Sequence, residues 1–328
     1  MFTFSNNQES LFYINDKPVY AQFERDPKKR IPPFKDAKQF LGSDDFRERY
    51  NLSRLESNEI KKAIRSDIVP ENQQLKSKFY KIRKDLNSRL FSEIDLRGTN
   101  KSISYRFDDR VNEWAGSKLV VGSSSSGKTY LVKSWIEEAL KLKKKRKFIY
   151  ISPEFYLDKT LKKLRNSKRY QKYFEGIDVS DDTFGETDYG SPEDWFKEVI
   201  KPKLSNAPKG TVLVFDDSKD SVIYKESRAF MNKYLRTGRH KGVSVISLQH
   251  QIRGSSDTAQ FYSSVKHVFL FPRAGGKGKI SMFLHELTGL SNKRAHALVE
   301  LFAESGRWMA IHQFSPVVVF GPKYALFV

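Results

Sequence analysis

The segment from Gly122 to Thr129 restricts the fold of this chain more than any other part of it. It reads Gly-Ser-Ser-Ser-Ser-Gly-Lys-Thr, follows a short apolar run at 118–121, and precedes a stretch at 129–142 with helically spaced apolar residues. A glycine-rich turn between a strand and a helix lets main-chain N–H groups face an anion at the positive end of the helix dipole. A Gly/Ser-rich linker that matches by chance would lack the flanking strand and helix. The sequence therefore predicts a phosphate-binding P-loop.

The residues of this loop have separate expected roles. Lys128 is expected to bridge the β and γ phosphates of a nucleoside triphosphate, and the hydroxyl of Thr129 to bind Mg²⁺. The predicted cofactors are thus ATP and Mg²⁺. The predicted nucleotide-binding residues are Gly122, Ser123, Ser124, Ser125, Ser126, Gly127, Lys128, Thr129 and Tyr130.

Further apolar runs alternate with helical segments after the P-loop, at 148–151, 211–215, 243–248 and 265–271. Short runs that are apolar throughout are typical of strands covered on both faces. Their alternation with helices predicts an α/β fold with a mostly parallel sheet and helices on both faces. Ser191 followed by Pro192 predicts the start of a helix that runs to Leu204. Residues 280–302 are predicted to form a helical pair, and 308–328 paired strands that close a sheet edge or an interface.

Polar residues follow two of these predicted strands. The run 211–215 ends in Asp216 and Asp217, and the run 243–248 ends in Gln249. Because ligands of such sheets lie at the carboxyl ends of the strands, we expect these side chains beside the P-loop. Asp216 is predicted to hold Mg²⁺ through water, Asp217 to orient or deprotonate the attacking water, and Gln249 to contact the γ-phosphate or that water. Ordinary turn chemistry for the two acids, and a solvated strand end for Gln249, are the alternatives.

These segments together resemble the HerA/FtsK superfamily of DNA-translocating ATPases, and within it the genome-packaging ATPases of poxviruses, giant viruses and virophages. The resemblance rests on 122–129, on TVLVFDD at 211–217, and on Gly-Arg-His followed by GVSVISLQ at 238–249, and it covers roughly residues 105–325. It implies a P-loop NTPase fold of the RecA-like additional-strand type. It also makes 122–129 the Walker A motif, Asp216 and Asp217 the Walker B pair, and Gln249 the sensor.

The resemblance also implies an arginine finger, which reaches the γ-phosphate bound by a neighbouring subunit. Arg239 is the predicted finger, with Arg236 as the second choice and a solvated basic turn as the alternative. Cellular relatives usually carry Glu where this chain has Asp217. Because Asp is one methylene shorter, the position of the attacking water is less closely defined by the family pattern.

The first hundred residues differ in pattern from the rest. We predict an accessory region at 1–100, with a hairpin at 11–23 that turns at Asn15 and Asp16, and a charged helical stretch at 55–91. In that stretch Leu75, Phe79, Ile82, Leu86 and Leu90 form one apolar stripe. The predicted P-loop ATPase domain is 101–328, with a boundary near 98–102.

The chain is strongly basic, with 59 Lys and Arg against 39 Asp and Glu and a formal net charge of +20. Such an excess favours a polyanionic partner, with nucleic acid the leading candidate, although a generally basic proteome or a solubilising surface is the alternative. The resemblance implies that this partner is double-stranded DNA. Three basic clusters, at 141–147, 162–172 and 273–279, are candidates to contact it. The chain has no cysteine, which excludes disulfides and thiolate metal sites. We expect no membrane partner, no secretion, and a location in the host cytoplasm, the virus factory or the virion.

The function implied by the resemblance is that of an ATP-hydrolysing DNA translocase that packages a viral double-stranded DNA genome into a capsid. Such a motor works as a homo-oligomeric ring, and capsid proteins are further expected partners. A helicase or a terminase-like ATPase is one alternative, although little chain is left after the ATPase domain for a terminase nuclease. A nucleotide-dependent DNA-binding switch with little turnover is another.

Overall fold

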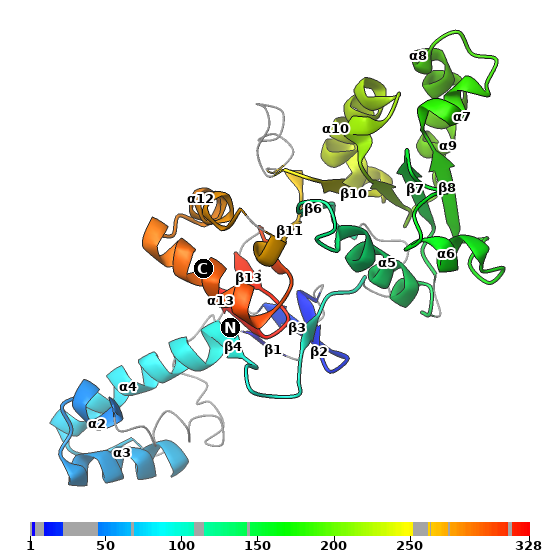
Figure 1. Cartoon of the computed structure of the whole chain (residues 1–328). Helices are drawn as coiled ribbons and strands as arrows, with labels where there is room; N and C mark the ends of the chain where they lie inside the picture. Colours follow the sequence, from blue (N-terminus) through cyan, green and yellow to red (C-terminus); the bar gives the residue numbers. More distant parts are fainter. Residues whose placement is uncertain are drawn as a thin grey trace.

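The structure is a computed structural model that describes residues 2–3, 10–21, 45–66, 69–107, 115–142, 145–251, 262, 264–274, 276–313 and 317–328 (Figure 1). Its centre is a sheet of ten strands in the order β4-β14-β13-β12-β11-β6-β10-β9-β7-β8. Within the described residues, no helix combines the length and apolar character needed to cross a bilayer.

One half of this sheet is parallel. The parallel strands are β6 (Lys118–Val121), β7 (Phe148–Ser152), β8 (Phe174–Asp178), β9 (Val212–Phe215), β10 (Ser244–Gln249) and β11 (His267–Leu270). β10 lies between β6, which leads into the P-loop, and β9, which leads into the two aspartates. An extra strand at this place defines the additional-strand type, so the predicted fold class is confirmed. The predicted strands are present, whereas β8 was not predicted.

The other half of the sheet is antiparallel. It continues from β11 through β12 (Met309–His312), β13 (Val318–Phe320), β14 (Tyr324–Phe327) and β4 (Glu93–Asp95). The expectation that the C-terminal residues form paired strands beside the sheet is therefore confirmed. The predicted helical pair before them is also present, as α12 (Lys277–Thr288) and α13 (Asn292–Ser305).

Both faces of the parallel half are covered by helices. Successive residues of a strand point to opposite sides of the sheet, so neighbouring residues of β6 belong to different cores. In β6, Leu119 and Val121 belong to a core shared with α10 (Tyr224–Lys241), α12 and α13. Val120, between them, belongs to a second core shared with α5 (Lys128–Ala139). This second core also includes Phe12 of the N-terminal hairpin, whose ring centroid lies 5.1 Å from that of Phe320.

The helix predicted from Ser191 to Leu204 forms in three sections. The Ser191 side chain accepts a hydrogen bond from the amide of Asp194 and begins α8 (Pro192–Trp195). A π-helical turn (Phe196–Ile200) and α9 (Lys201–Ser205) follow. Pro202, which lacks an amide proton, stands just after the π turn, where the regular α-helical ladder is interrupted. The remaining short helices on this side are α6 (Lys162–Asn166) and α7 (Asp181–Gly185).

The N-terminal hairpin forms as predicted, with β2 (Phe12–Ile14), β3 (Lys17–Ala21), and Asn15 and Asp16 at the turn. Both turn residues have positive φ, 46° and 65°, which a two-residue hairpin turn requires and which Asn and Asp tolerate. The small sheet β1-β3-β2-β5 is completed by β1 (Phe2–Thr3) and β5 (Ile103–Ser104).

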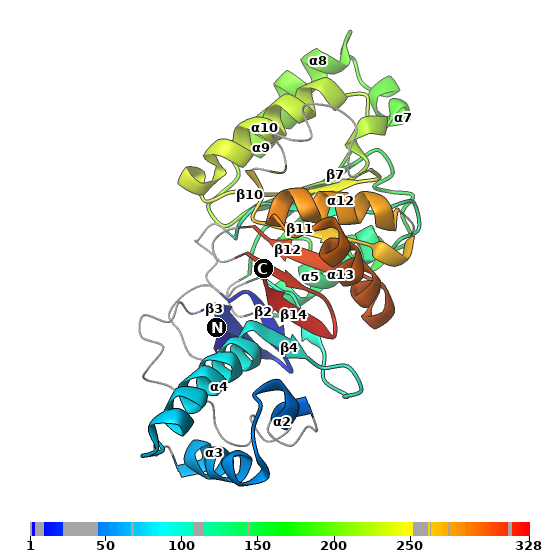
Figure 2. The same cartoon turned by 90° about the vertical axis from the view of Figure 1, so that its left-hand side faces the viewer.

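Three further helices, α2 (Asp45–Arg49), α3 (Arg54–Ser66) and α4 (Gln73–Ser92), project away from the large sheet (Figures 1 and 2). They enclose a separate core that contains Leu75, Phe79 and Ile82, which confirms this part of the predicted stripe. The side chains of Leu86 and Leu90 lie outside the described residues.

Two strand pairings link the predicted N-terminal region to the predicted ATPase domain. β4, which precedes residue 100, pairs with β14 of the large sheet, and β5, which follows it, pairs with β2 of the hairpin. The division at residue 100 stays a prediction, and these pairings tie the N-terminal residues to the rest of the chain at two places.

Candidate functional site

The P-loop is a tight turn whose two glycines are needed for different reasons. A Cβ on Gly122 would lie 2.5 Å from Ser126 Oγ and 3.0 Å from the Phe271 ring, so a side chain there would force both neighbours to shift. Gly127 has φ 102°, a value that residues with a side chain rarely adopt. No side chain caps the helix that follows, so its first N–H groups face the loop without a side-chain acceptor. This is the arrangement that binds anions at helix N-termini.

The side chain of Lys128 folds back into the loop. Its ammonium donates hydrogen bonds to the carbonyl oxygens of Gly122, at 2.9 Å, and Ser123, at 3.1 Å. Burial lowers the pKa of Lys128, while the carboxylates of Asp217 and Asp216 act in the opposite direction. An amine held here beside two acids is placed to meet the phosphates of a nucleotide bound on the loop.

The two aspartates lie at the edge of the sheet where the P-loop begins, as predicted. Thr129 Oγ1 is 3.2 Å from Asp216 Oδ2 and donates to it. The hydroxyl of Tyr150 on β7 donates to the same oxygen. Asp216 is 4% exposed, and its other oxygen, Oδ1, has no hydrogen-bond partner among the described residues. The structure therefore brings together the two side chains predicted to hold Mg²⁺.

Asp216 is a buried carboxyl, and its burial outweighs the effect of the nearby Lys128 charge. Burial raises its pKa to about 6, and the neighbouring Asp217 carboxylate acts in the same direction. Burial and the Asp216 charge raise the pKa of Tyr150 well above its usual value, so its phenol stays a neutral donor. An unpaired carboxylate oxygen next to a hydroxyl suits a hard divalent cation such as Mg²⁺. Among the described residues, no group of three or more acidic or histidine side chains is placed to hold a metal ion.

The end of β10 lies against the start of the P-loop. The main-chain oxygen of Gln249 accepts a hydrogen bond of 3.1 Å from the amide of Gly122. The Gln249 side chain donates to Ser247 Oγ at 3.3 Å. The next residue, His250, lies between Asp217 and Lys128. Its Nε2 is 2.6 Å from Asp217 Oδ1, and its Nδ1 is 3.4 Å from Lys128 Nζ.

Two residues of this site, Tyr150 and His250, were not predicted. Strand parity could have indicated Tyr150, because alternate residues of β7 face α5 and the P-loop. His250 follows Gln249 at the same sheet edge. Because ligands lie at the carboxyl ends of such strands, His250 could have been predicted beside the P-loop as Gln249 was. Neither has a residue-type signal of its own, since a Tyr within a strand and a His just after a strand are common in many settings.

The predicted arginine fingers lie far from the P-loop of their own chain. Arg239 and Arg236 are exposed in the last turns of α10, just before the start of β10. The P-loop lies at the other end of β10. Neither arginine therefore contacts its own P-loop, and a role toward a neighbouring subunit stays a prediction.

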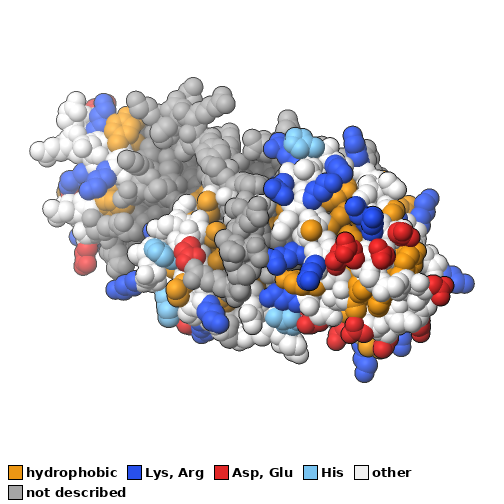
Figure 3. All heavy atoms as spheres, turned by 90° about the horizontal axis from the view of Figure 1, so that it is seen from above, with side chains coloured by type: hydrophobic (Ala, Val, Ile, Leu, Met, Phe, Trp, Pro, Cys, Tyr) orange, Lys and Arg blue, Asp and Glu red, His pale blue; other side chains and the backbone are white. Residues whose placement is uncertain are grey.

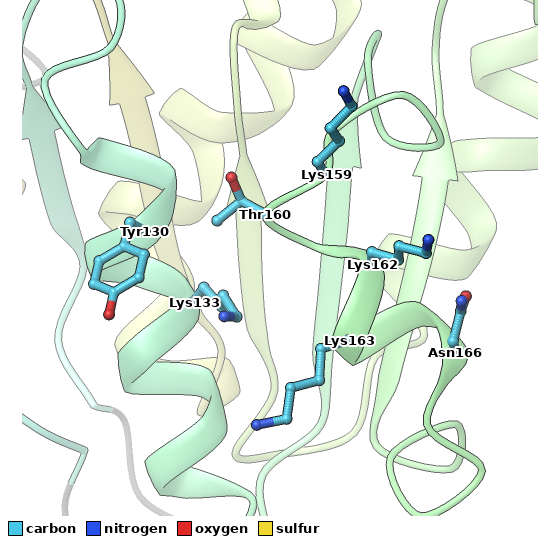
Figure 4. A pocket seen from close by; sticks show the side chains of 7 residues that line it. All are labelled: Tyr130, Lys133, Lys159, Thr160, Lys162, Lys163 and Asn166. Atoms are coloured by element: carbon cyan, nitrogen blue, oxygen red, sulfur yellow. The ribbon is translucent and has the colours of Figure 1, made fainter.

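A basic pocket of about 640 Å³ opens beside α5 (Figure 4). Tyr130 and Lys133 line it from α5, and the opposite wall comes from the segment after β7; the lining residues are Tyr130, Lys133, Lys159, Thr160, Lys162, Lys163 and Asn166. Tyr130 is 66% exposed. Its lining therefore includes Tyr130, a predicted nucleotide-binding residue, together with Lys162, Lys163 and Asn166 of the predicted basic cluster 162–172.

No protein-family model and no curated protein matches the sequence. Among solved structures, the chain is similar to the genome packaging NTPase B204 of Sulfolobus turreted icosahedral virus 2 in complex with ATP-gammaS. The identity is 15%, the TM-score is 0.39, and the match covers 65% of this chain and 98% of that one. The pCW3 conjugation coupling protein TcpA is similar at 14% identity and TM-score 0.37, over 65% of this chain and 61% of that one.

The cytoplasmic domain of the Type VII secretion ATPase EccC from Thermomonospora curvata is similar at 14% identity and TM-score 0.41, with 65% of this chain and 26% of that one covered. At these identities the likeness is one of fold. The class itself follows from the strand order around β6 and from the P-loop at its end. The chain has the fold of a P-loop NTPase of the additional-strand type.

Proposed function

We propose that this protein hydrolyses ATP to move double-stranded DNA and packages a viral genome into a capsid. The proposal rests on one observation: Lys128, Thr129, Asp216 and Asp217 meet at the mouth of the P-loop, although they come from two strands separated by a third. Capsid proteins are further proposed partners.

The proposed roles follow from the positions of the side chains. Lys128 binds the β and γ phosphates, and main-chain N–H groups at the start of α5 bind their oxygens. Thr129 and Asp216 hold Mg²⁺, which neutralises phosphate charge when bound. Asp217 orients or deprotonates the attacking water, and Gln249 contacts that water or the γ-phosphate. Tyr130 lies one residue beyond Thr129 with an exposed ring, and we place the nucleoside end of ATP beside it.

Arg239 is the proposed finger of a ring-shaped homo-oligomer. Its exposure, and its distance from its own P-loop along β10, support a role only between subunits. A mixture of Arg239→Ala subunits, which keep a P-loop, with Lys128→Ala subunits, which keep the arginine, is expected to recover turnover that neither variant shows alone. ATP hydrolysis across a series of mixing ratios measures this.

Arg236→Ala is the matched control, because Arg236 is exposed one turn earlier on the same helix. It is expected to retain most of the activity by itself. A mixture that stays as inactive as its two components would contradict the assignment of Arg239.

DNA as the partner is supported by the net charge of +20 and by the lysines of the basic pocket. Lys and Arg side chains are scattered over the face seen in Figure 3, with Asp and Glu gathered near the α7–α8 end. A motor that moves along any sequence needs contacts to phosphates rather than to bases. We therefore expect binding that weakens steeply with added salt.

ATP hydrolysis with and without double-stranded DNA tests the proposed function. We expect DNA to raise the rate, because the grip on DNA and the nucleotide site act in one cycle. A rate that DNA does not change, with tight ATP binding and little turnover, would support the nucleotide-dependent switch instead. Strand separation on a forked duplex would support a helicase.

A further inference from the structure

His250 connects two groups that have opposite charges and separate proposed roles. Its Nε2 is 2.6 Å from Asp217 Oδ1, and its Nδ1 is 3.4 Å from Lys128 Nζ. The Lys128 ammonium only donates, so Nδ1 is the acceptor of this contact and a neutral imidazole carries its proton on Nε2. That nitrogen lies at ion-pair distance from Asp217 without a hydrogen bond, because Oδ1 of Asp217 has no hydrogen-bond partner among the described residues. The three side chains thus form a continuous chain of polar contacts from the P-loop to the acid at the end of β9.

Lys128 has no donor left over in this arrangement. An ammonium has three N–H groups, and here they meet the carbonyl oxygens of Gly122 and Ser123 and the Nδ1 atom of His250. A triphosphate on the loop therefore competes with these acceptors for Lys128. Asp217 lies at ion-pair distance from the other side of the same imidazole ring.

We propose that His250 is a positioning residue that holds Lys128 and Asp217 together until a triphosphate takes Lys128 away. The phosphates then replace His250 as the partner of the ammonium. Nδ1 loses its donor, the lysine charge moves away from the imidazole, and Asp217 becomes available to the attacking water. This step rests on the proposed function, because it takes Asp217 as the group that acts on that water.

Removal of the imidazole is expected to favour nucleotide binding. In His250→Ala, Lys128 has one competing acceptor fewer, so a fluorescent, non-hydrolysable ATP analogue with Mg²⁺ should bind about three- to tenfold more tightly, the effect of one lost hydrogen bond. For hydrolysis, we expect KM to fall by a similar factor while kcat changes by less than about twofold. His250→Gln keeps an amide donor and acceptor and should bind the analogue with an affinity between the two.

A spectroscopic measurement follows the imidazole directly. The chain has six histidines, so the ring-nitrogen NMR signals of isotope-labelled histidine are few, and the signal missing from His250→Ala identifies His250. Addition of the ATP analogue with Mg²⁺ to the wild-type protein should shift the Nδ1 signal of His250. The other five signals and the melting temperature serve as checks of folding.

His296→Ala is the matched control, because His296 is an exposed residue of α13, far along the chain from the P-loop. It should leave the analogue affinity unchanged. Unchanged or weaker binding in His250→Ala, or a His250 signal that does not respond to the analogue, would overturn the proposal. If the wild-type protein binds the analogue no better than Lys128→Ala does, the proposed function itself fails, whatever the histidine variants show.

Discussion

Lys128→Ala is expected to reduce ATP turnover by about 10²–10³-fold or more, because it removes the positive charge that meets the phosphates in the transition state. The ammonium is the only charged donor that the structure places inside the loop among the described residues. Its loss also leaves Asp216 and Asp217 without a neighbouring cation, so the bound triphosphate would face two acids with no lysine between them. ATP hydrolysis and analogue binding by the purified variant measure the effect.

Lys141→Ala is the matched control, because Lys141 is an exposed lysine that follows the end of the same helix. In the absence of DNA it should hydrolyse ATP as the wild type does, because the cluster 141–147 is a candidate to contact DNA and not the nucleotide. Equal nucleotide affinity and turnover in Lys128→Ala and Lys141→Ala would remove the basis for a nucleotide site on this loop.

Asp216→Asn is expected to stop Mg²⁺-dependent turnover and at the same time to stabilise the protein. The folded state binds the Asp216 proton more tightly than the unfolded chain, since its pKa is about 6 instead of 3.8. The ionised side chain therefore makes the free energy of unfolding fall as the pH rises from about 4 to about 6. A neutral amide avoids this loss, so we expect a gain of about 2–3 kcal/mol at neutral pH without Mg²⁺.

Urea unfolding without Mg²⁺ at pH 4.5 and at pH 7.5 measures this prediction. The advantage of Asp216→Asn should be large at the higher pH and small at the lower one, where Asp216 of the wild type carries a proton. Asp220→Asn is the control, because Asp220 is an exposed acid just after the same strand. A stability difference that is the same at both pH values would contradict the raised pKa of the buried Asp216.

The parts of the fold that could be predicted are those with strong local patterns. The P-loop, its strand and its helix share one continuous segment, and the apolar runs that became β7, β9, β10 and β11 stand out from a polar chain. The turn at Asn15 and Asp16 was predictable because few residues accept positive φ. By contrast, β8 was missed because only its Phe174 and Ile177 are apolar and buried, as befits a strand at the edge of the sheet.

The sequence by itself determined the P-loop turn between β6 and α5 and predicted a phosphate site there, because the glycines and Lys128 of that turn act on atoms within a few residues of each other. Only the tertiary structure decided which distant side chains complete the site. Tyr150 reaches Asp216, and His250 reaches both Asp217 and Lys128, because β10 lies between β6 and β9 while β7 lies beside β9. That strand order follows from the packing of helices on both faces of the sheet, which depends on contacts between residues far apart in the chain and leaves no pattern at Tyr150 or His250 themselves.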